Sequence, residues 1–315
     1  MDLSLSMSVV FPLCLYICAG VLANRLRWLD EQAVGKVNRF LFKAMFPLIM
    51  FENVMNAGDA LRGGNLGAAG YLLAVNTVVF VLLMLLVPRF VQGRPRQGSV
   101  IQGCFRANSV LFALPIVTTI CGADRTGVAS VCVSLVVPYY NMLCVIALES
   151  KRGGRIRPLK LLKGVLTNPL ILGALAGAVP MLLGVRLPEL LAKPVHTMTS
   201  MVTPLALMLL GANLRFAGLK KDLKPLIGVS LIKLIAVPLF IVGGAWLLGF
   251  RGEAFVSVFA LSCVPTAVSS YSMAVEMDAD GPLAAEIVAV TTVCSMLTVF
   301  LWVSVLSGAG AFAGL

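Results

Sequence analysis

Charged side chains are scarce in this chain. Only 12% of its 315 residues are Asp, Glu, Lys or Arg, whereas ordinary globular domains carry about 25%. Hydrophobic residues make up 59%, the mean hydropathy is +0.96, and apolar runs longer than ~18 residues recur along the chain. The sequence therefore predicts a polytopic membrane protein and not a soluble domain. The net charge of +11 does not indicate nucleic-acid binding, because Lys and Arg lie in short loops between the apolar runs.

Patterns that bind metals or form disulfides are also missing. The single histidine is His196, and none of the eight cysteines forms a CxxC pair. Because the cysteines fall almost entirely inside apolar runs, we expect small buried thiols, no metal site and no cofactor. An intramembrane enzyme needs two mid-membrane aspartates, a Ser–His pair or a histidine cluster. His196 stands alone and no aspartate lies mid-span, so we do not expect an enzyme.

The apolar runs predict ten membrane-spanning helices joined by short loops. The expected spans are 5–24, 34–56, 67–88, 98–121, 126–148, 165–184, 194–214, 224–249, 253–274 and 282–307. A basic cytoplasmic linker, 150–163, separates a first set of five (1–149) from a second (164–315). Lys and Arg concentrate in the loops after the odd-numbered spans. We therefore expect those loops in the cytoplasm and both termini outside the inner (plasma) membrane, on the periplasmic side.

The two sets of five spans match each other at one fixed offset. Pro47 corresponds to Pro204, and Asn56 to Asn213, and each pair is separated by 157 residues. This pattern predicts an internal duplication. Since five is an odd number, the second copy must lie upside down in the bilayer, which is the inverted repeat typical of secondary transporters.

Helix-breaking and polar residues interrupt the fourth and ninth expected spans. The fourth, "GCFRANSVLFALPIVTTICG", contains Arg106, Asn108 and Ser109. The offset places Asn108 opposite Pro265, in "LSCVPTAVSSYSMAVEM" of the ninth. Broken spans at matching positions of two halves are the best sequence indication of a transporter's binding site, and unwound backbone is tolerated there only inside protein or beside a water-filled cavity. Two such breaks would present helix N-termini, which favour an anion.

Arg106 has two interpretations. A cation within a span costs at least ~2.5 kcal/mol, and residues that bear this cost usually lie on a substrate path. Its planar fork of donors matches a carboxylate, although a single arginine is marginal for a dianion. The alternative is that Arg106 lies near enough to the cytoplasmic end of its span to reach the interface and anchor the helix.

Further polar side chains complete the predicted site. The alternative is interhelical hydrogen bonding for Asn53, Thr203 and Asn213. For Thr266, Ser269 and Ser270 it is close helix packing, and for the run with Tyr140 and Asn141 it is an aromatic position at the membrane interface. The candidates for substrate contact are Arg106, Asn108, Ser109, Pro265, Thr266, Ser269, Ser270, Asn53, Thr203, Asn213, Tyr140 and Asn141. A proton-coupled carrier also needs a buried carboxylate. Glu52, Glu276 and Glu286 are the candidates, and the sequence does not assign the coupling ion, H+ or Na+, to any of them.

Five segments, taken in order, resemble motifs of the auxin efflux carrier family, which includes bacterial malate and malonate permeases. They are "NRFLFKAMFPLIMFENVMN", "FRANSVLFALP", "NPLILGALAGAVP", "TPLALMLLGANL" and "VPTAVSSYSMAVEM". The family is similar to the bile, arsenite and riboflavin type of transporters. In the plant members, helices 4 and 9 cross at one proline each. The matching positions here are Ala107 and Pro265, so this chain keeps only the proline of helix 9, and the break in helix 4 must depend on Asn108 and Ser109.

The resemblance implies an all-α fold of the sodium/proton-antiporter type. It has ten helices in two inverted five-helix repeats, with broken helices 4 and 9 crossing. Helices 1, 2, 6 and 7 would form a scaffold, and helices 3–5 and 8–10 a transport domain that moves as an elevator. Family members also occur as homodimers, and this sequence does not identify such an interface.

Together, these patterns predict a secondary carrier in the lipid bilayer for a small organic anion. A mono- or dicarboxylate such as malonate or malate would bind where helices 4 and 9 cross. Amphipathic aromatic carboxylates, as in auxin carriers, are one alternative. A channel or a sensor on the same scaffold is the other, and saturable flux with counterflow would distinguish a carrier from a channel.

Overall fold

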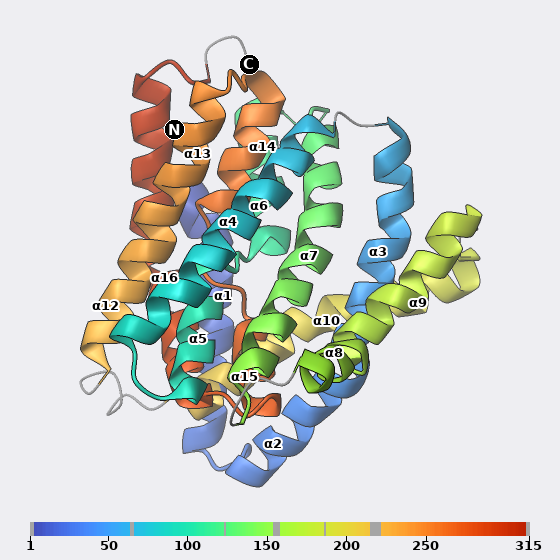
Figure 1. Ribbon diagram of the computed structural model, residues 1–315, viewed down its shortest axis with the longest axis vertical. Helices are drawn as coiled ribbons and strands as arrows, with labels where there is room; N and C mark the ends of the chain where they lie inside the picture. Colours follow the sequence, from blue (N-terminus) through green and yellow to red (C-terminus); the bar gives the residue numbers. More distant parts are fainter. Residues whose placement is uncertain are drawn as a thin grey trace.

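The computed structural model describes residues 3–63, 66–122, 124–153, 158–185, 187–214 and 222–312. Within these ranges every regular element is a helix (Figure 1). The elements are α1 (Leu3–Arg25), α2 (Glu31–Phe40), η1 (Leu41–Met45), α3 (Phe46–Gly63), α4 (Gly67–Phe90), α5 (Arg94–Phe105), α6 (Ser109–Cys121), α7 (Gly127–Lys151), α8 (Pro158–Leu166), α9 (Pro169–Leu183), α10 (Glu189–Asn213), α12 (Leu223–Leu231), η2 (Ile232–Ala236), α13 (Val237–Leu247), α14 (Gly252–Ser262), α15 (Ser269–Glu276) and α16 (Gly281–Gly308).

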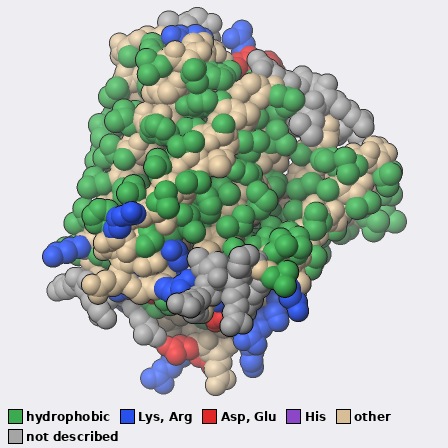
Figure 2. Space-filling model, viewed as in Figure 1, with side chains coloured by type: hydrophobic (Ala, Val, Ile, Leu, Met, Phe, Trp, Pro, Cys, Tyr) green, Lys and Arg blue, Asp and Glu red, His purple; other side chains and the backbone are tan. Residues whose placement is uncertain are grey.

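The described helices include five that are long and apolar enough to cross a membrane, judged by length and composition. These are α4, α7, α10, α16 and the continuous helix Leu223–Leu247, which comprises α12, η2 and α13. Shorter apolar helices accompany them, among them α6, α9 and α14. Figure 2 shows hydrophobic side chains over most of the visible face, with Lys and Arg gathered towards its lower end. The predicted class, an all-helical membrane protein, is confirmed at this level.

Polar caps fix where several helices begin. Asp30 accepts a hydrogen bond from the amide of Ala33 at 2.6 Å and starts α2. Asn168 accepts one from the amide of Leu170 at 3.0 Å and starts α9. Such caps satisfy amides that have no partner within the helix. Because Asn168 stops the preceding helix, the segment expected as one span over 165–184 is divided into α8, which lies partly in the expected linker, and α9.

Backbones approach closely in two helix pairs, and glycines make this approach feasible. The α1 helix packs against α10, and α3 packs against α9. A Cβ atom on Gly20 would overlap the carbonyl oxygen of Met208, and one on Gly177 would overlap that of Phe51. The two pairs are therefore held by backbone-to-backbone contact, as in membrane helices that carry small residues at their interfaces.

Two helix breaks meet at the centre of the molecule. The first lies between α5 and α6 at residues 106–108, and the second between α14 and α15 at residues 263–268. The amide of Asn108 donates to the carbonyl of Pro265 at 2.9 Å, and Ala107 and Thr266 form an antiparallel β-bridge. Backbone groups freed by each break are thereby satisfied by the other, as a buried position requires. We call this meeting point the crossing.

Candidate functional site

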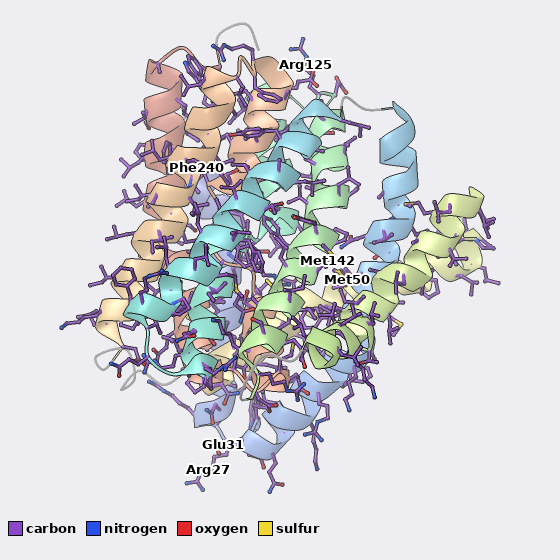
Figure 3. All side chains as sticks on the ribbon, in the orientation of Figure 1. Arg27, Glu31, Met50, Arg125, Met142 and Phe240 are labelled. Atoms are coloured by element: carbon purple, nitrogen blue, oxygen red, sulfur yellow. The ribbon has the colours of Figure 1, made fainter. Side chains whose placement is uncertain are left out.

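A cavity of about 90 Å3 lies beside the crossing. Its walls come from α3 and α10 on one side and from the crossing, α7 and the start of α15 on the other. The lining residues are Phe46, Ile49, Met50, Arg106, Ala107, Asn108, Ser109, Val110, Val137, Tyr140, Asn141, Thr203, Ala206, Ala267, Val268 and Ser269. Met50, labelled in Figure 3, lies where α3 approaches α7.

Arg106 directly follows the last residue of α5, and its side chain is held inside the protein. Only 3% of the residue is exposed. Its Nη2 atom donates to Asn141 Oδ1 at 2.5 Å and to Ser269 Oγ at 2.7 Å, and Nη1 donates to the sulfur of Met273. The guanidinium therefore points into the crossing and lines the cavity, and it does not extend along the helix to the membrane interface.

The charge of Arg106 is not balanced by a carboxylate. Among the described residues, the acidic side chains in ion pairs are bound to other cations. The acceptors that Arg106 contacts are uncharged groups: an amide, a hydroxyl, a thioether and the thiol of Cys144. A buried charge without a counter-charge is costly, by several kcal/mol after relaxation. An anion in the adjoining cavity would remove this cost.

Other groups at the crossing also favour an anion. The Nδ2 atom of Asn108 is buried and has no hydrogen-bond partner among the described residues, although Asn108 lines the cavity. The α6 helix begins at Ser109 and α15 begins at Ser269, so both helices direct their N-termini to the crossing. Helix N-termini carry partial positive charge. A free amide donor, two helix N-termini and one guanidinium thus converge on the same cavity.

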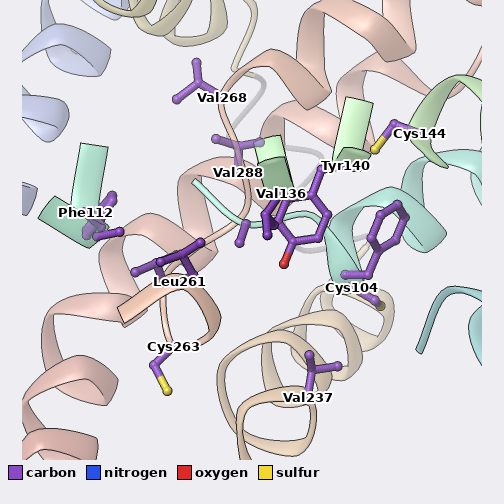
Figure 4. Close-up of a cluster of buried hydrophobic side chains, with 14 of the residues drawn as sticks. Cys104, Phe112, Val136, Tyr140, Cys144, Val237, Leu261, Cys263, Val268 and Val288 are labelled. Atoms are coloured by element: carbon purple, nitrogen blue, oxygen red, sulfur yellow. The ribbon is translucent and has the colours of Figure 1, made fainter. Parts of the chain in front are cut away.

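The α7 wall contributes Tyr140 and Asn141 in different ways. Asn141 donates through Nδ2 to the carbonyl of Val137 at 2.9 Å, which orients its Oδ1 towards Arg106. The ring of Tyr140 lines the cavity, whereas its hydroxyl donates to Asn76 Oδ1 on α4 at 3.0 Å. Figure 4 shows Tyr140 within the buried cluster around Val136. The hydroxyl of Tyr140 is therefore bound to α4.

Thr266 and Ser270 take up positions behind the cavity. Thr266 donates through Oγ1 to the carbonyl of Gly103 at 2.7 Å and so ties the second break to the end of α5. Ser270 is 1% exposed, and its Oγ has no partner among the described residues. Its carbonyl accepts from Gln102 Nε2 at 2.9 Å. Neither side chain lines the cavity, unlike Ser109 and Ser269.

The remaining predicted contacts are divided between the cavity and the helix interfaces. Thr203 on α10 lines the cavity. Asn213 donates to the hydroxyl of Tyr271, which joins α10 to α15. The Nδ2 atom of Asn53 is buried on α3 without a partner among the described residues, and it lies outside the cavity lining. Pro265 contributes through its carbonyl to the crossing.

None of the three candidate coupling carboxylates lines the cavity. Glu52 on α3 lies 2.9 Å from His196 Nδ1 and accepts from Thr199 at 2.5 Å. Glu276 accepts from Asn38 Nδ2 at 3.2 Å.

Glu286 is the most buried of the three, with 2% exposure in the first turns of α16. Its Oε2 atom has no hydrogen-bond partner among the described residues. Glu286 thus differs from the other two carboxylates in its deeper burial and in this unpartnered oxygen. In the part of the chain that the structure describes, no group of His, Cys, Asp and Glu is arranged to hold a metal ion.

Several residues of the site were missed in the sequence. Met273 contacts Arg106 without lining the cavity; it follows Ser269 by one helical turn, and this i,i+4 spacing was the available signal. Phe46, Ile49 and Met50 share one face of α3 at i, i+3 and i+4. They are apolar residues in an apolar span, so hydropathy alone does not separate them from residues that face lipid.

Comparison with known proteins gives two findings. Residues 5–303 match the family described as membrane transport protein. A stretch of 103 residues is 30% identical to an uncharacterized transporter of Methanothermobacter thermautotrophicus, and the match covers 33% of this chain and 34% of that protein. The chain thus spans about a third of the length of this curated relative.

Proposed function

Because the chain belongs to the membrane transport protein family, we propose that it is a secondary transporter of a small organic anion, a mono- or dicarboxylate such as malonate or malate. The observation that carries the proposal is Arg106, a buried cation beside a cavity, which no carboxylate among the described residues balances. A bound carboxylate would neutralise the charge of Arg106 and accept a hydrogen bond from the unpartnered side-chain amide of Asn108.

An inverted repeat is part of the proposal and is supported by matching elements and contacts. A shift of 157 residues carries α4 (Gly67–Phe90) onto the continuous helix Leu223–Leu247. The same shift carries Gly20 onto Gly177 and Phe51 onto Met208. The close contact of Gly20 with Met208 therefore has a counterpart in the contact of Gly177 with Phe51, with the two halves exchanged.

At the crossing, equivalent positions of the two halves also contact each other. Asn108 and Pro265 are also separated by 157 residues, and they pair with each other. Two equivalent positions that contact one another lie on the axis that relates the two halves. Substrate sites of transporters with inverted repeats lie at this interface near the middle of the bilayer. We therefore infer that the substrate binds at the crossing, and that both termini lie on the side opposite the basic loops.

In the proposed elevator mechanism, the scaffold and the transport domain both contribute residues to the cavity wall. In the proposed division, α1, α2, α3, α9 and α10 form the scaffold, which contributes Met50 and Thr203. The transport domain contributes Arg106, Asn141 and Ser269. An anion held by Arg106 would therefore move with the transport domain when that domain slides past the scaffold, which is the requirement for alternating access by an elevator.

The first experiment is the thermal stability of the purified protein with a panel of carboxylates, for wild type and Arg106→Ala. A ligand that binds only the folded state stabilises it by about 2.7 kcal/mol at 100 times its Kd. We expect at least one small carboxylate to raise the melting temperature of wild type and not of Arg106→Ala. Arg39→Ala removes an exposed cation from α2 and is the matched control, which keeps the response. Equal responses of wild type and Arg106→Ala would refute anion binding by Arg106.

A second candidate substrate, an amphipathic aromatic carboxylate, is favoured by one observation. Most of the cavity wall away from Arg106 is apolar, including Phe46, Val137 and Val268. Indole-3-acetate in the same panel tests this candidate. Counterflow in proteoliposomes distinguishes a carrier from a channel, because only a carrier exchanges labelled for unlabelled substrate.

A further inference from the structure

The described cavity provides one full positive charge and no second one. Arg106 is the only Lys, Arg or His among its lining residues, and the lining contains no Asp or Glu. The two helix N-termini add partial charge on the Arg106 side, since α15 begins at Ser269, which contacts Arg106. All positive potential in the cavity is therefore concentrated at one place.

The guanidinium of Arg106 is also largely occupied. Arginine carries five N–H donors, and three of them are directed to Asn141, Ser269 and Met273. The remaining two are on different nitrogens, Nε and Nη1, and the thiol of Cys144 also accepts a side-chain hydrogen bond from the guanidinium, so few of its donors are left for a ligand. The Nδ2 atom of Asn108 supplies the other unpartnered donor. These donors suffice for the oxygens of one carboxylate.

The opposite wall offers nothing that compensates a second charge. The scaffold side is formed by Phe46, Ile49, Met50 and Ala206, with the neutral hydroxyl of Thr203 as its polar group. A second carboxylate placed against this wall would lose its hydration without gaining a cation, and this is a large penalty for an ionised group. An alkyl group would instead bury apolar surface there.

The cavity volume limits the size of the ligand. The volume of about 90 Å3 is small compared with pockets for drug-sized ligands, which measure about 300–1,000 Å3. The cavity is partly open, so a carboxylate with a short body is enclosed by it, whereas a longer body would extend out through the opening.

We propose that the substrate is a short-chain monocarboxylate, whose single charge is bound by Arg106 and Asn108 and whose apolar end packs against Phe46, Ile49 and Met50. The proposal rests on the proposed function and narrows it. It makes dicarboxylates poor ligands in their fully ionised form, and it makes aromatic acids, which are too large to be enclosed by the cavity, weaker ligands than short monocarboxylates.

The test compares propionate and butyrate with malonate and indole-3-acetate, with half-maximal thermal stabilisation of wild-type protein as the readout. We expect the monocarboxylates to act at concentrations at least about tenfold lower than malonate at neutral pH, a difference of about 1.4 kcal/mol. As the pH falls and malonate becomes a monoanion, its half-maximal concentration should decrease relative to that of propionate. Arg106→Ala should abolish all of these responses.

The outcomes separate the two proposals. If malonate acts as well as or better than propionate at neutral pH and requires Arg106, the transporter is an anion carrier and the monocarboxylate assignment is wrong. A preference for indole-3-acetate would overturn the size limit in the same way. If no carboxylate stabilises wild type more than Arg106→Ala, anion recognition itself fails.

A second variant tests the apolar wall directly. Ile49→Lys adds a cation to the side of the cavity opposite Arg106, with Ile49→Met as the matched control of similar volume. We expect Ile49→Lys to lower the ratio of malonate to propionate half-maximal concentrations at least about tenfold, and Ile49→Met to leave it unchanged. An unchanged ratio in a folded Ile49→Lys protein would contradict the proposed position of the apolar end.

Discussion

The amide nitrogen of Asn108 lies 2.9 Å from the carbonyl oxygen of Pro265, and this hydrogen bond closes two helix breaks on each other. Each break frees backbone donors and acceptors in a region without water. Pairing between the breaks satisfies these groups, so the side chains around them remain available for a ligand. Arg106, Asn108 and Ser269 all face the cavity for this reason.

An internal counter-charge should mimic the substrate. Asn141→Asp places a carboxylate where Oδ1 of Asn141 accepts from Arg106 at 2.5 Å. Because the new charge compensates Arg106, we expect a higher melting temperature without ligand and a decrease in carboxylate affinity of about tenfold to a hundredfold, the range for hydrogen bonds to charged groups.

The control for this prediction is Asn141→Ala. It removes the acceptor without adding charge, so the ligand-free protein should become less stable while carboxylates still stabilise it. If Asn141→Asp and Asn141→Ala respond alike to carboxylates, charge compensation at Arg106 is not the basis of binding.

The hydroxyl of Ser269, at the start of α15, and that of Thr266, in the break before α15, should contribute differently to ligand binding. Ser269 contacts Arg106 in the cavity, whereas Thr266 donates to the carbonyl of Gly103 behind it. We expect Thr266→Val to lower stability by about 1–3 kcal/mol, because it leaves a buried carbonyl without a donor, and to leave carboxylate affinity unchanged in folded protein. Ser269→Ala should weaken carboxylate binding. Melting temperatures measured with and without ligand separate the two effects.

Tyr140→Phe tests whether the hydroxyl of this residue contacts substrate. The hydroxyl donates to Asn76 on α4, away from the cavity. We expect a loss of about 1 kcal/mol in stability and carboxylate affinity equal to that of wild type. A decrease in affinity would mean that the hydroxyl turns to the ligand. The double variant with Asn76→Ala should cost less than the sum of both single variants, because the two residues share one hydrogen bond.

Substitution at the close helix contacts should destabilise both helix pairs. In Gly20→Ala and Gly177→Ala the new methyl group meets a backbone carbonyl that cannot rotate away. We expect each variant to lose about 1–3 kcal/mol, the usual cost of overpacking. Gly70→Ala on α4 is the control, because a Cβ there meets nothing within 4 Å. Equal melting temperatures for all three variants would show that α1 and α3 can move away from their partners at little cost.

Local patterns in the sequence predicted much of the fold. Hydropathy predicted an all-helical membrane protein, and the described residues form five helices long and apolar enough to cross a membrane, with shorter apolar helices beside them. The break at Asn108 followed from polar residues within an apolar run. The resemblance to auxin efflux carriers is confirmed by the family match over residues 5–303. The start of α9 at Pro169 was placed four residues too early, because the expected span 165–184 took no account of the cap at Asn168.

Contacts between distant residues were not predictable. The sequence identified Arg106 and Asn141 as candidates, but the hydrogen bond between them depends on how α7 packs against the crossing. Thr266 and Ser269 are equivalent by residue type, and only the path of the backbone determines that one faces the cavity. The π-helical segments η1 and η2 had no recognised sequence signature, since one extra residue in a turn leaves hydropathy unchanged.

The close contacts of Gly20 and Gly177 have a consequence for each half of the chain on its own. Gly20 and Phe51 belong to the first half, and their partners Met208 and Gly177 belong to the second. Under the proposed inverted repeat, Phe51 is the equivalent of Met208, so in a protein made of one half only Gly20 would meet it on another molecule. The proposal then implies that such a half-length chain forms an antiparallel homodimer to bury these surfaces, with opposite orientations of its two copies in one membrane.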